Sequence, residues 1–371
     1  MTRRTNTRSA ALAIAVLGAA SIGLGPAGGN AAAGSPRPAA TVAPTLAQLV
    51  GQRMLVSFRG TTPDSALLAR IRAGQVGGVI LFGSNIVDAT QLANLTAKLQ
   101  AAARAGGRPP LVIATDQEGG LVRRLSWAPP RLSAQQLGTL SAASVQTVGQ
   151  RTGVALRAAG VNLDLAPVAD VPRRPSNFIL AQHRAFATSR YTVANDAAAF
   201  ALGLEAGGVR PTYKHFPGLG WAGATSTDDA LVKIWASARQ INYDLLPYRV
   251  ALTRSVRPVV MLSTAVYPAY SNKAAAWSPR IAVTLLRTTL GFRGVTVTDS
   301  LTSAAAVRGT TPMVLAVRSA TAGVDLLLVT GSELTSQAAY NAVLAQARSG
   351  AIPLASLTAS YHRILSLKSR F

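Results

Sequence analysis

Eight short apolar segments recur along this chain, and they constrain its fold more than any other feature. They cover Met54–Phe58, Gly78–Phe82, Leu111–Thr115, Val161–Leu165, Val209–Tyr213, Val259–Leu262, Gly294–Thr298 and Asp325–Val329. The segments are nearly continuous apolar runs, which is typical of parallel strands buried on both faces. We therefore expect eight strands of a parallel sheet.

Stretches with helical periodicity separate most of these strands and continue to the end of the chain. They cover Thr90–Ala105, Ala134–Ala158, Ala194–Ala206, Asp244–Leu252, Pro312–Thr321, Ser336–Arg348 and Leu354–Leu367. Eight strand–helix units favour a closed barrel over an open doubly wound sheet, and no G-x-G-x-x-G sequence follows the first strand. We predict an α/β fold, a single (β/α)8 TIM-type barrel at residues 45–371.

Residues 1–33 have the order of an export signal. Arg3, Arg4 and Arg8 precede an apolar run at Ala10–Leu24, and small residues follow at positions 31–34. A membrane anchor is the alternative, but the run falls short of the ~20 apolar residues that span a bilayer. We expect a secreted or envelope-associated protein without stable membrane insertion, exported by the general or the twin-arginine route. Residues 34–44, rich in Pro and Ala, should form a linker.

The composition narrows the expected partners. The chain has no cysteine, which excludes disulfides and thiolate metal ligands. Its formal net charge is +23, and +20 remains without the three arginines of the signal, so polyanions should be attracted to it. The basic residues are scattered and not clustered with aromatic residues, so we expect anionic cell-envelope polymers and no nucleic acid. An arginine-rich surface that reflects a GC-rich genome is the alternative.

Polar residues follow several of the predicted strands, at the end where barrels of this kind carry their active sites. They are Asp116, Gln117 and Glu118 after the third strand, Asp164 and Asp170 in and after the fourth, Lys214 and His215 after the fifth, and Asp299 at the end of the seventh. Each carboxylate taken alone is also suited to cap a helix N-terminus. A ring of such residues around a Lys-His pair predicts an active site.

The same regions resemble glycoside hydrolase family 3. The matching motifs are Gly77–Phe82 with Asn85, Thr115–Gly120 with Val122 and Arg124, Gly160–Val168, His183–Phe186, Lys214–Gly218 and Val297–Asp299. The chain is most similar to the bacterial single-domain β-N-acetylhexosaminidases of this family. The resemblance implies a (β/α)8 barrel and hydrolysis of β-linked sugars with retention of configuration. It implies N-acetylglucosaminides of cell-wall or related glycans as substrates, and neither a cofactor nor a metal.

The resemblance also implies roles for individual residues. Asp299 matches the nucleophile that forms a covalent glycosyl-enzyme intermediate. Asp116 would accept hydrogen bonds from the bound sugar, and Arg184, Lys214 and His215 would donate them. Two structural alternatives stay open. Asp299 is also suited to cap the following helix, and Lys214 to form a buried ion pair with Asp116 or Asp299.

Two further residues are expected beside this pocket. Two glycines follow Glu118, so we expect Glu118 to support the site rather than to contact the sugar. Arg124 is counted among the substrate-binding residues, where it would also orient Glu118.

The sequence departs from the family in its acid/base loop. In this branch an Asp-Ser-His sequence after the fifth strand supplies a histidine general acid/base, whereas this chain has Thr225-Ser226-Thr227. Leu219 and Ser300 also replace a histidine and an acidic residue that are usual there. Asp228 follows the vacant position, so we expect it to act as the replacement acid, with Asp229 in reserve. A solvated acidic pair is the alternative.

Two classes of function therefore compete. The first is a secreted glycosidase that uses Asp299 and a relocated acid. The second is a carbohydrate-binding protein on a hydrolase scaffold, with weak turnover or none. The retained Asp299 favours the enzyme, whereas the lost histidine favours the binding protein. A single barrel leads us to expect a monomer in either case.

The export signal predicts where the mature chain begins. Mass spectrometry of the protein from a culture supernatant should show a first residue close to Gly34, because small residues suited to signal peptidase end at that point. A cytosolic protein that retains Met1 would contradict this prediction.

Overall fold

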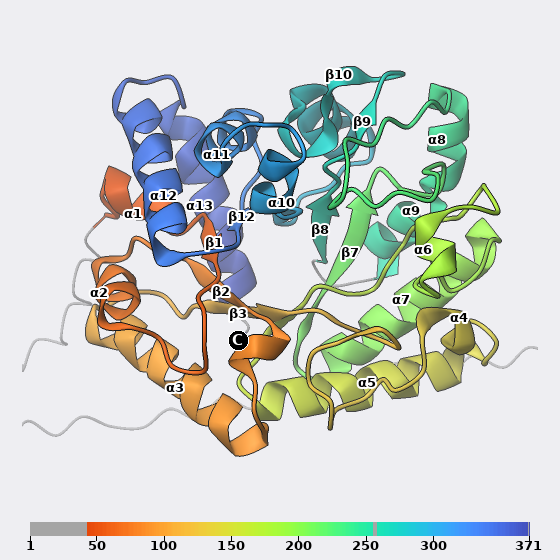
Figure 1. Ribbon diagram of the computed structural model, residues 1–371, viewed down its shortest axis with the longest axis horizontal. Coiled ribbons are helices and arrows are strands. Elements are labelled where there is room, and N and C mark those ends of the chain that lie inside the picture. The colour runs from red at the N-terminus through yellow and green to blue at the C-terminus, as the bar shows by residue number, and fades with distance from the viewer. Residues whose placement is uncertain (1–42, 255–257, 370) are drawn as a thin grey trace, which may run out of the picture. The chain divides into compact units, whose positions relative to one another are not determined.

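The computed structural model describes residues 43–254, 258–369 and 371, and residues 44–371 form one unit (Figure 1). The predicted signal at residues 1–33 and residues 34–42 of the predicted linker lie outside the described residues. Within the described part of the chain, no helix is long and apolar enough to cross a membrane.

Eight strands form one parallel sheet that curves into a barrel. They are β1 (Met54–Val56), β2 (Gly78–Leu81), β3 (Val112–Thr115), β6 (Leu163–Asp164), β7 (Arg210–Phe216), β8 (Val259–Leu262), β11 (Thr296–Thr298) and β12 (Leu327–Val329). The strand order is β11-β8-β7-β6-β3-β2-β1-β12. A parallel bridge between Val297 and Leu326 joins the two end strands. The predicted (β/α)8 barrel is therefore confirmed, and each apolar segment contributes one strand.

The side chains of each strand divide between two cores with a period of two. Leu55, Ile80 and Val112 belong to the cluster that fills the barrel. Their neighbours Val56 and Val79 belong to the larger cluster beneath the helices. Because both faces are buried, the strands need apolar residues at consecutive positions, which explains the continuous runs in the sequence.

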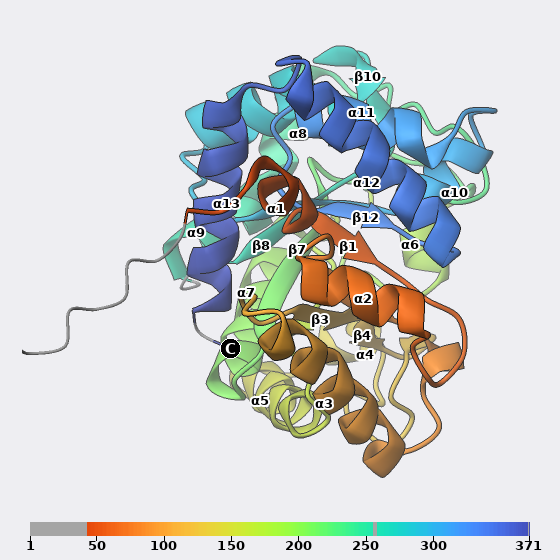
Figure 2. The ribbon, with the colours of Figure 1, turned by 90° about the vertical axis from the view of Figure 1, so that its left-hand side faces the viewer.

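The helices surround the barrel (Figure 2). They are α1 (Leu46–Gly51), α2 (Ser65–Ala73), α3 (Ala89–Ala105), α4 (Ala134–Leu137), α5 (Ala142–Ala158), α6 (Phe178–Ala181), α7 (Arg190–Ala206), α8 (Ala238–Asp244), α9 (Leu246–Arg254), α10 (Leu301–Ala306), α11 (Pro312–Thr321), α12 (Glu333–Arg348) and α13 (Leu354–Lys368). Short 3-10 helices η1 (Gly83–Asn85) and η2 (Ala275–Trp277) and a π-helix η3 (Arg280–Thr289) complete them.

Two predicted helices differ from the structure. The expected helix at residues 134–158 is divided into α4 and α5, because Ser141 caps the start of α5 and Gly138 packs against the backbone of Phe186. The expected helix at residues 244–252 is shifted. Asp244 ends α8, and α9 begins at Leu246 beside Pro247, a residue favoured in the first turn of a helix.

Small hairpins extend from the barrel where the strands end. The first consists of β4 (Gln117–Gly119) and β5 (Val122–Arg123) and follows β3. The second consists of β9 (Val266–Tyr267) and β10 (Ser271–Ala274) and follows β8. Both hairpins therefore stand at the carboxyl end of the barrel, where residues predicted for the site are also found.

Helices α5 and α7 are in backbone contact through glycine. A Cβ atom on Gly203 of α7 would lie 2.2 Å from the carbonyl oxygen of Gln146, and one on Gly149 of α5 would lie 2.3 Å from that of Phe200. Contacts this short do not occur between real atoms, so these positions require glycine. The close approach holds α5 against α7, and α7 in turn packs against β7, which carries Lys214 and His215.

This contact predicts that Gly203→Ala will destabilise the protein. Alanine is the better helix former by about 1 kcal/mol, but the displaced backbone should cost more, for a net loss of about 1–3 kcal/mol in the free energy of unfolding. Urea denaturation measures it. Gly223→Ala is the matched control, since its Cβ would meet nothing within 4 Å. Equal stability of the two variants would contradict the packing argument.

Candidate active site

A pocket of about 290 Å³ opens at the carboxyl ends of the strands. Its polar lining residues are Asp116, Glu118, Arg124, Arg184, Lys214, His215, Ser226, Thr227, Asp228, Asp299, Ser300, Ser303 and Thr330. Its walls also contain apolar side chains, among them Phe82, Leu165 and Met261. The pocket has the size and mixed lining of a site for one small polar ligand.

Nearly all residues predicted for the site line this one pocket. They are Asp116, Arg124, Arg184, Lys214, His215, Asp228 and Asp299. Asp229 is the exception, since it is exposed and does not contribute to the lining. The structure thus brings together side chains from five parts of the chain that lie up to 183 positions apart.

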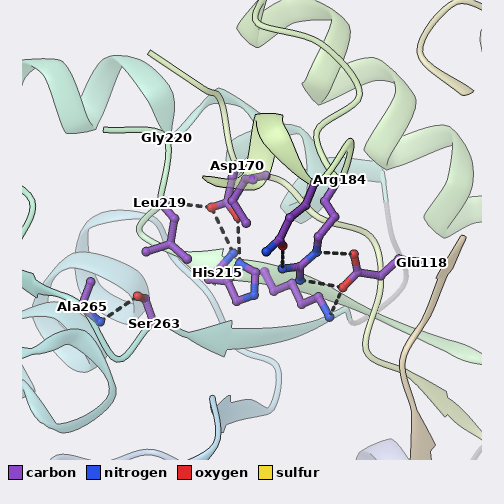
Figure 3. A network of polar contacts seen from close by, with 12 residues as sticks. Glu118, Asp170, Arg184, His215, Leu219, Gly220, Ser263 and Ala265 are labelled. Atoms are coloured by element: carbon purple, nitrogen blue, oxygen red, sulfur yellow. Dashed lines mark hydrogen bonds and ion pairs between the residues drawn. The ribbon is translucent and has the colours of Figure 1, made fainter. Parts of the chain in front are cut away.

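Glu118 is the centre of a buried ion-pair network in the pocket wall (Figure 3). Its Oε1 lies 2.6 Å from Lys214 Nζ. Arg184 donates through Nε to Oε2 and through Nη2 to Oε1, both at 2.8 Å. Burial alone would raise the pKa of Glu118, but Arg184 and Lys214 outweigh that effect and hold it well below its usual range. Glu118 is therefore a fixed negative charge between two cations.

Lys214 joins this network to Asp116. Its Nζ lies 2.8 Å from Asp116 Oδ1, so the ion pair that the sequence left as an alternative is present. Burial would lower the pKa of Lys214, but the carboxylates of Asp116 and Glu118 raise it above its usual value. An ammonium group has three donors, and these two contacts leave one for a ligand.

Arg124 does not orient Glu118, contrary to the expectation from sequence. Its Nη2 lies 3.7 Å from Asp116 Oδ2, and its guanidinium stands 5.9 Å from the centre of the Phe82 ring. Arg184 makes the contact to Glu118 instead. No local sequence pattern indicates which arginine contacts Glu118, because Arg184 is 66 positions away from it.

His215 is fixed by a buried carboxylate. Its Nδ1 lies 2.8 Å from Asp170 Oδ2, and Asp170 Oδ1 accepts from the backbone N–H of Leu219 at 2.7 Å (Figure 3). A carboxylate accepts hydrogen bonds, so Nδ1 carries the proton and Nε2 is left for a ligand. In the neutral ring Nε2 accepts a hydrogen bond. His215 donates to a sugar, as the resemblance implied, only when its ring is protonated.

The end of β7 departs from regular pairing where these residues lie. Its register with β8 shifts between Tyr213 and Phe216. In a regular strand Lys214 and His215 would point to opposite faces. Within this irregular interval both line the pocket. The sequence signal for the site was the Lys214-His215 pair close to the Pro217-Gly218 turn, with only Phe216 between them.

Asp164 supports the pocket from below. Its Oδ1 accepts from the backbone N–H of Gln117 at 2.9 Å, which fixes the segment between Asp116 and Glu118. Burial raises the pKa of Asp164 to about 8, so the group is protonated at neutral pH. Asp164 is absent from the pocket lining, and its role is to position the backbone.

Asp299 follows β11 at the rim of the barrel and is not a helix cap. Ser300 is the N-cap of α10, where its side chain accepts from Ser303 N. Asp299 Oδ1 accepts from the backbone N–H of Ser300 at 2.7 Å. The alternative that Asp299 caps the helix is therefore excluded, and its half-buried carboxylate faces the pocket.

The loop that follows β7 contributes the opposite side of the pocket. Thr227, which occupies the position of the expected histidine, is buried in the wall. Asp228 also lines the pocket, although as a whole residue it is exposed at the mouth. Loss of solvent around its carboxyl group raises the pKa of Asp228, and the negative charge of Asp299 raises it further, while His215 opposes the shift. The two carboxylates therefore interact electrostatically across the pocket.

The described parts of the chain contain no group of three His, Cys, Asp or Glu residues placed to hold a metal ion. The carboxylates of the pocket are instead distributed between cationic partners and the pocket mouth.

A sequence profile of the Glycosyl hydrolase family 3 N terminal domain matches residues 45–367. The chain belongs to glycoside hydrolase family 3. The family 3 chain is 36% identical over 341 residues to a protein from Arthroderma benhamiae named an uncharacterized secreted glycosyl hydrolase. That match covers 90% of this chain and 96% of the other.

Two solved structures of glycosidases are similar to this protein. The β-N-acetylhexosaminidase of Beutenbergia cavernae shares 34% identity at a TM-score of 0.80, over 89% of this chain and 100% of that chain. The β-N-acetylglucosaminidase of a Paenibacillus species shares 32% identity at a TM-score of 0.82. That match covers 88% of this chain and 63% of the longer Paenibacillus chain. These findings confirm that the protein is a glycoside hydrolase of family 3 with a barrel fold.

The ion-pair network predicts that Glu118→Gln will destabilise this family 3 enzyme. Neutralising Glu118 leaves two buried cations without it and should cost about 3–5 kcal/mol of unfolding free energy at pH 7. Asp116→Asn is the matched control. The Asp116 side chain is 15% exposed against 3% for Glu118, and Lys214 keeps Glu118 as partner, so about 1 kcal/mol or less is expected.

The difference in unfolding free energy between the wild type and Glu118→Gln should become smaller as the pH falls. The pKa of Glu118 is lower in the folded chain than its ordinary 4.5, so its contribution is complete above that pH and declines as pH falls. Urea unfolding at pH 7 and pH 3.5 measures this, and the gap should narrow at pH 3.5. A gap that widens would contradict the assigned charges.

Proposed function

We propose that the protein is a retaining β-N-acetylhexosaminidase in which Asp299 is the nucleophile and Asp228 the general acid/base. One observation carries the proposal. Asp299 and Asp228 line the same pocket, and the charge of Asp299 raises the pKa of Asp228. Retaining glycoside hydrolysis requires one carboxyl group that holds a proton and a second carboxylate that attacks, and a raised pKa suits Asp228 to the first role.

In the first step Asp299 attacks the anomeric carbon. Its Oδ1 accepts from Ser300 N, so Oδ2 is the oxygen assigned to the attack. The bond from the anomeric carbon to the leaving oxygen breaks, and that oxygen takes the proton of Asp228. In the second step Asp228 removes a proton from water, the water oxygen bonds to the anomeric carbon, and the carboxylate of Asp299 is released.

The interaction between the two carboxylates suits both steps. Before the first step the negative charge of Asp299 helps Asp228 to keep its proton, as an acid must. Once Asp299 is esterified, that charge is gone and the pKa of Asp228 falls. Asp228 then serves as the base for water. No histidine is needed for this cycle.

The ion-pair network supports a role in holding the sugar. Lys214 keeps one donor. Asp116 Oδ2 lies 3.7 Å from Arg124 Nη2, so a sugar hydroxyl beside the two atoms can donate to the first and accept from the second. Because Glu118 fixes Lys214 and Arg184, these donors are positioned before a ligand arrives. The N-acetyl specificity rests on the names of the similar enzymes. We further propose that the protein is exported, that it acts as a monomer, and that its substrates are cell-wall or related glycans.

A carbohydrate-binding protein is the second candidate, and one observation favours it. Thr227 fills the position where relatives of this branch are expected to carry their acid/base histidine, and threonine does not protonate a leaving group at neutral pH. If Asp228 is only a solvated acid at the mouth, the pocket would bind a sugar without efficient turnover.

The two candidates predict different results with paired substrates. Asp228→Asn should slow hydrolysis of an aryl β-N-acetylglucosaminide with a poor leaving group by about 10²–10⁴, because that step needs a proton donor. The rate of the first step on a dinitrophenyl substrate should fall much less in Asp228→Asn, because this leaving group needs no proton. In Asp228→Ala, added azide should accelerate turnover of the dinitrophenyl substrate by attacking the exposed glycosyl-enzyme intermediate.

Asp229→Asn is the matched control, since Asp229 is the adjacent acid and is not part of the pocket lining. It should retain nearly full activity on both substrates. Equal small losses in both variants would remove Asp228 as the acid. No turnover of either substrate by the wild type, with sugar binding retained, would favour the carbohydrate-binding protein.

A further inference from the structure

A second cavity, of about 740 Å³, is strongly basic. Lys233, Lys273, Arg308 and Arg318 line it together with Trp277. We call this cavity the basic groove. Its lining residues include no Asp or Glu, and no ion pair is found for the four cations within the described residues.

The groove and the catalytic pocket share two segments of chain. The loop after β7 gives Thr227 and Asp228 to the pocket and Lys233 to the groove. The α10 segment gives Ser303 to the pocket and, five residues later, Arg308 to the groove. The segment that carries the proposed acid Asp228 therefore also carries Lys233 of the groove.

The loop is fixed where it reaches the groove. Ile234 N donates to Val266 O at 2.8 Å, and Val266 N donates to Val232 O at 2.9 Å. These bonds attach the loop to β9 of the β9–β10 hairpin (Figure 1). Lys233 is thus carried on an ordered segment and not on a free loop tip.

Arg308 is the cation of the groove whose side chain is held in place by its neighbours. Its guanidinium donates to the carbonyl oxygens of Ala304 and Thr264 and stands 5.0 Å from the centre of the buried Trp277 ring. Burial lowers the pKa of Arg308, with no carboxylate to oppose the shift. The other three cations are exposed. A partly buried arginine without a counter-ion, surrounded by exposed cations, forms a site for an anion.

We propose that the basic groove binds the anionic chain of a polymer whose β-linked sugar enters the catalytic pocket, and that this chain is a phosphodiester-linked polyol. This inference rests on the proposed glycosidase function for the sugar end and on the groove itself for the anionic end. The protein would then recognise a sugar through its pocket and the polymer that carries it through Lys233, Lys273, Arg308 and Arg318.

Binding tests the groove without any need for turnover. Sugar-free oligo(glycerol phosphate) should bind the wild-type protein, and binding should weaken as salt rises because exposed charges are screened. Replacing the three exposed cations in Lys233→Gln/Lys273→Gln/Arg318→Gln should weaken binding about tenfold or more. The same change of net charge in Lys98→Gln/Arg104→Gln/Arg151→Gln, on α3 and α5, should alter it by about twofold or less. Equal losses in both triple variants would overturn the proposal.

Two further probes identify the polymer. A uronic acid oligomer and single-stranded DNA of equal charge should bind more weakly than oligo(glycerol phosphate). Tighter binding of the uronic acid oligomer would replace the phosphodiester with a carboxylate polymer. Tighter binding of DNA would make nucleic acid the ligand of the groove. Either result would overturn the assignment of the polyol phosphate.

Kinetics then connect the groove to the pocket. The groove variant should have a raised KM, by about tenfold, for oligo(glycerol phosphate) that carries β-N-acetylglucosamine, with unchanged kinetics on a neutral aryl β-N-acetylglucosaminide. An equal loss on both substrates would show that the groove does not act through the anionic chain. If the wild type hydrolyses neither substrate, the proposed glycosidase function fails, and the binding experiment still decides the groove.

Discussion

The charge of Glu118 in the barrel wall is the interaction on which the rest of the site depends. It holds Lys214 of β7 and Arg184 of the segment after α6 at hydrogen-bond distance, and it stands within the β4–β5 hairpin. Burying the charges of Lys214, Arg184 and Glu118 costs free energy of desolvation. Their mutual attraction offsets this cost only when all three groups are present. The arrangement fixes the donors that we propose for sugar binding before any ligand is present.

The loop after β7 also lines the pocket, and there the resemblance implies a departure from the related enzymes. Thr227 is buried in a position where the resemblance implies a histidine, while Asp228 reaches the pocket beside it. The same loop continues to Lys233 in the basic groove. Under the proposed function, the loop would supply both the proton donor and part of the surface that binds the polymer. Glu118, Lys214 and Arg184 would form the part of the site that recognises the sugar.

Sequence predicted the barrel well because every strand is buried on both faces and so leaves a continuous apolar run, as at Gly78–Leu81. The sequence also predicted that polar residues after several strands would line one pocket, because the carboxyl ends of parallel strands converge. It did not predict that Arg184 rather than Arg124 contacts Glu118, because side-chain pairing across 66 positions leaves no local pattern. Nor did the sequence show which residue is the N-cap of α10. Asp299 and Ser300 both suit a helix start, and only the backbone geometry shows that Ser300 takes that position.

The covalent intermediate on Asp299 is the central claim, and trapping it is the most direct test. A 5-fluoro N-acetylglucosaminyl fluoride forms the glycosyl-enzyme but slows its hydrolysis, so peptide mass spectrometry can locate the label. The account predicts one labelled peptide that contains Val297-Thr298-Asp299, and no label in Asp299→Asn. A label on any other residue, or turnover by Asp299→Asn at the wild-type rate, would contradict it.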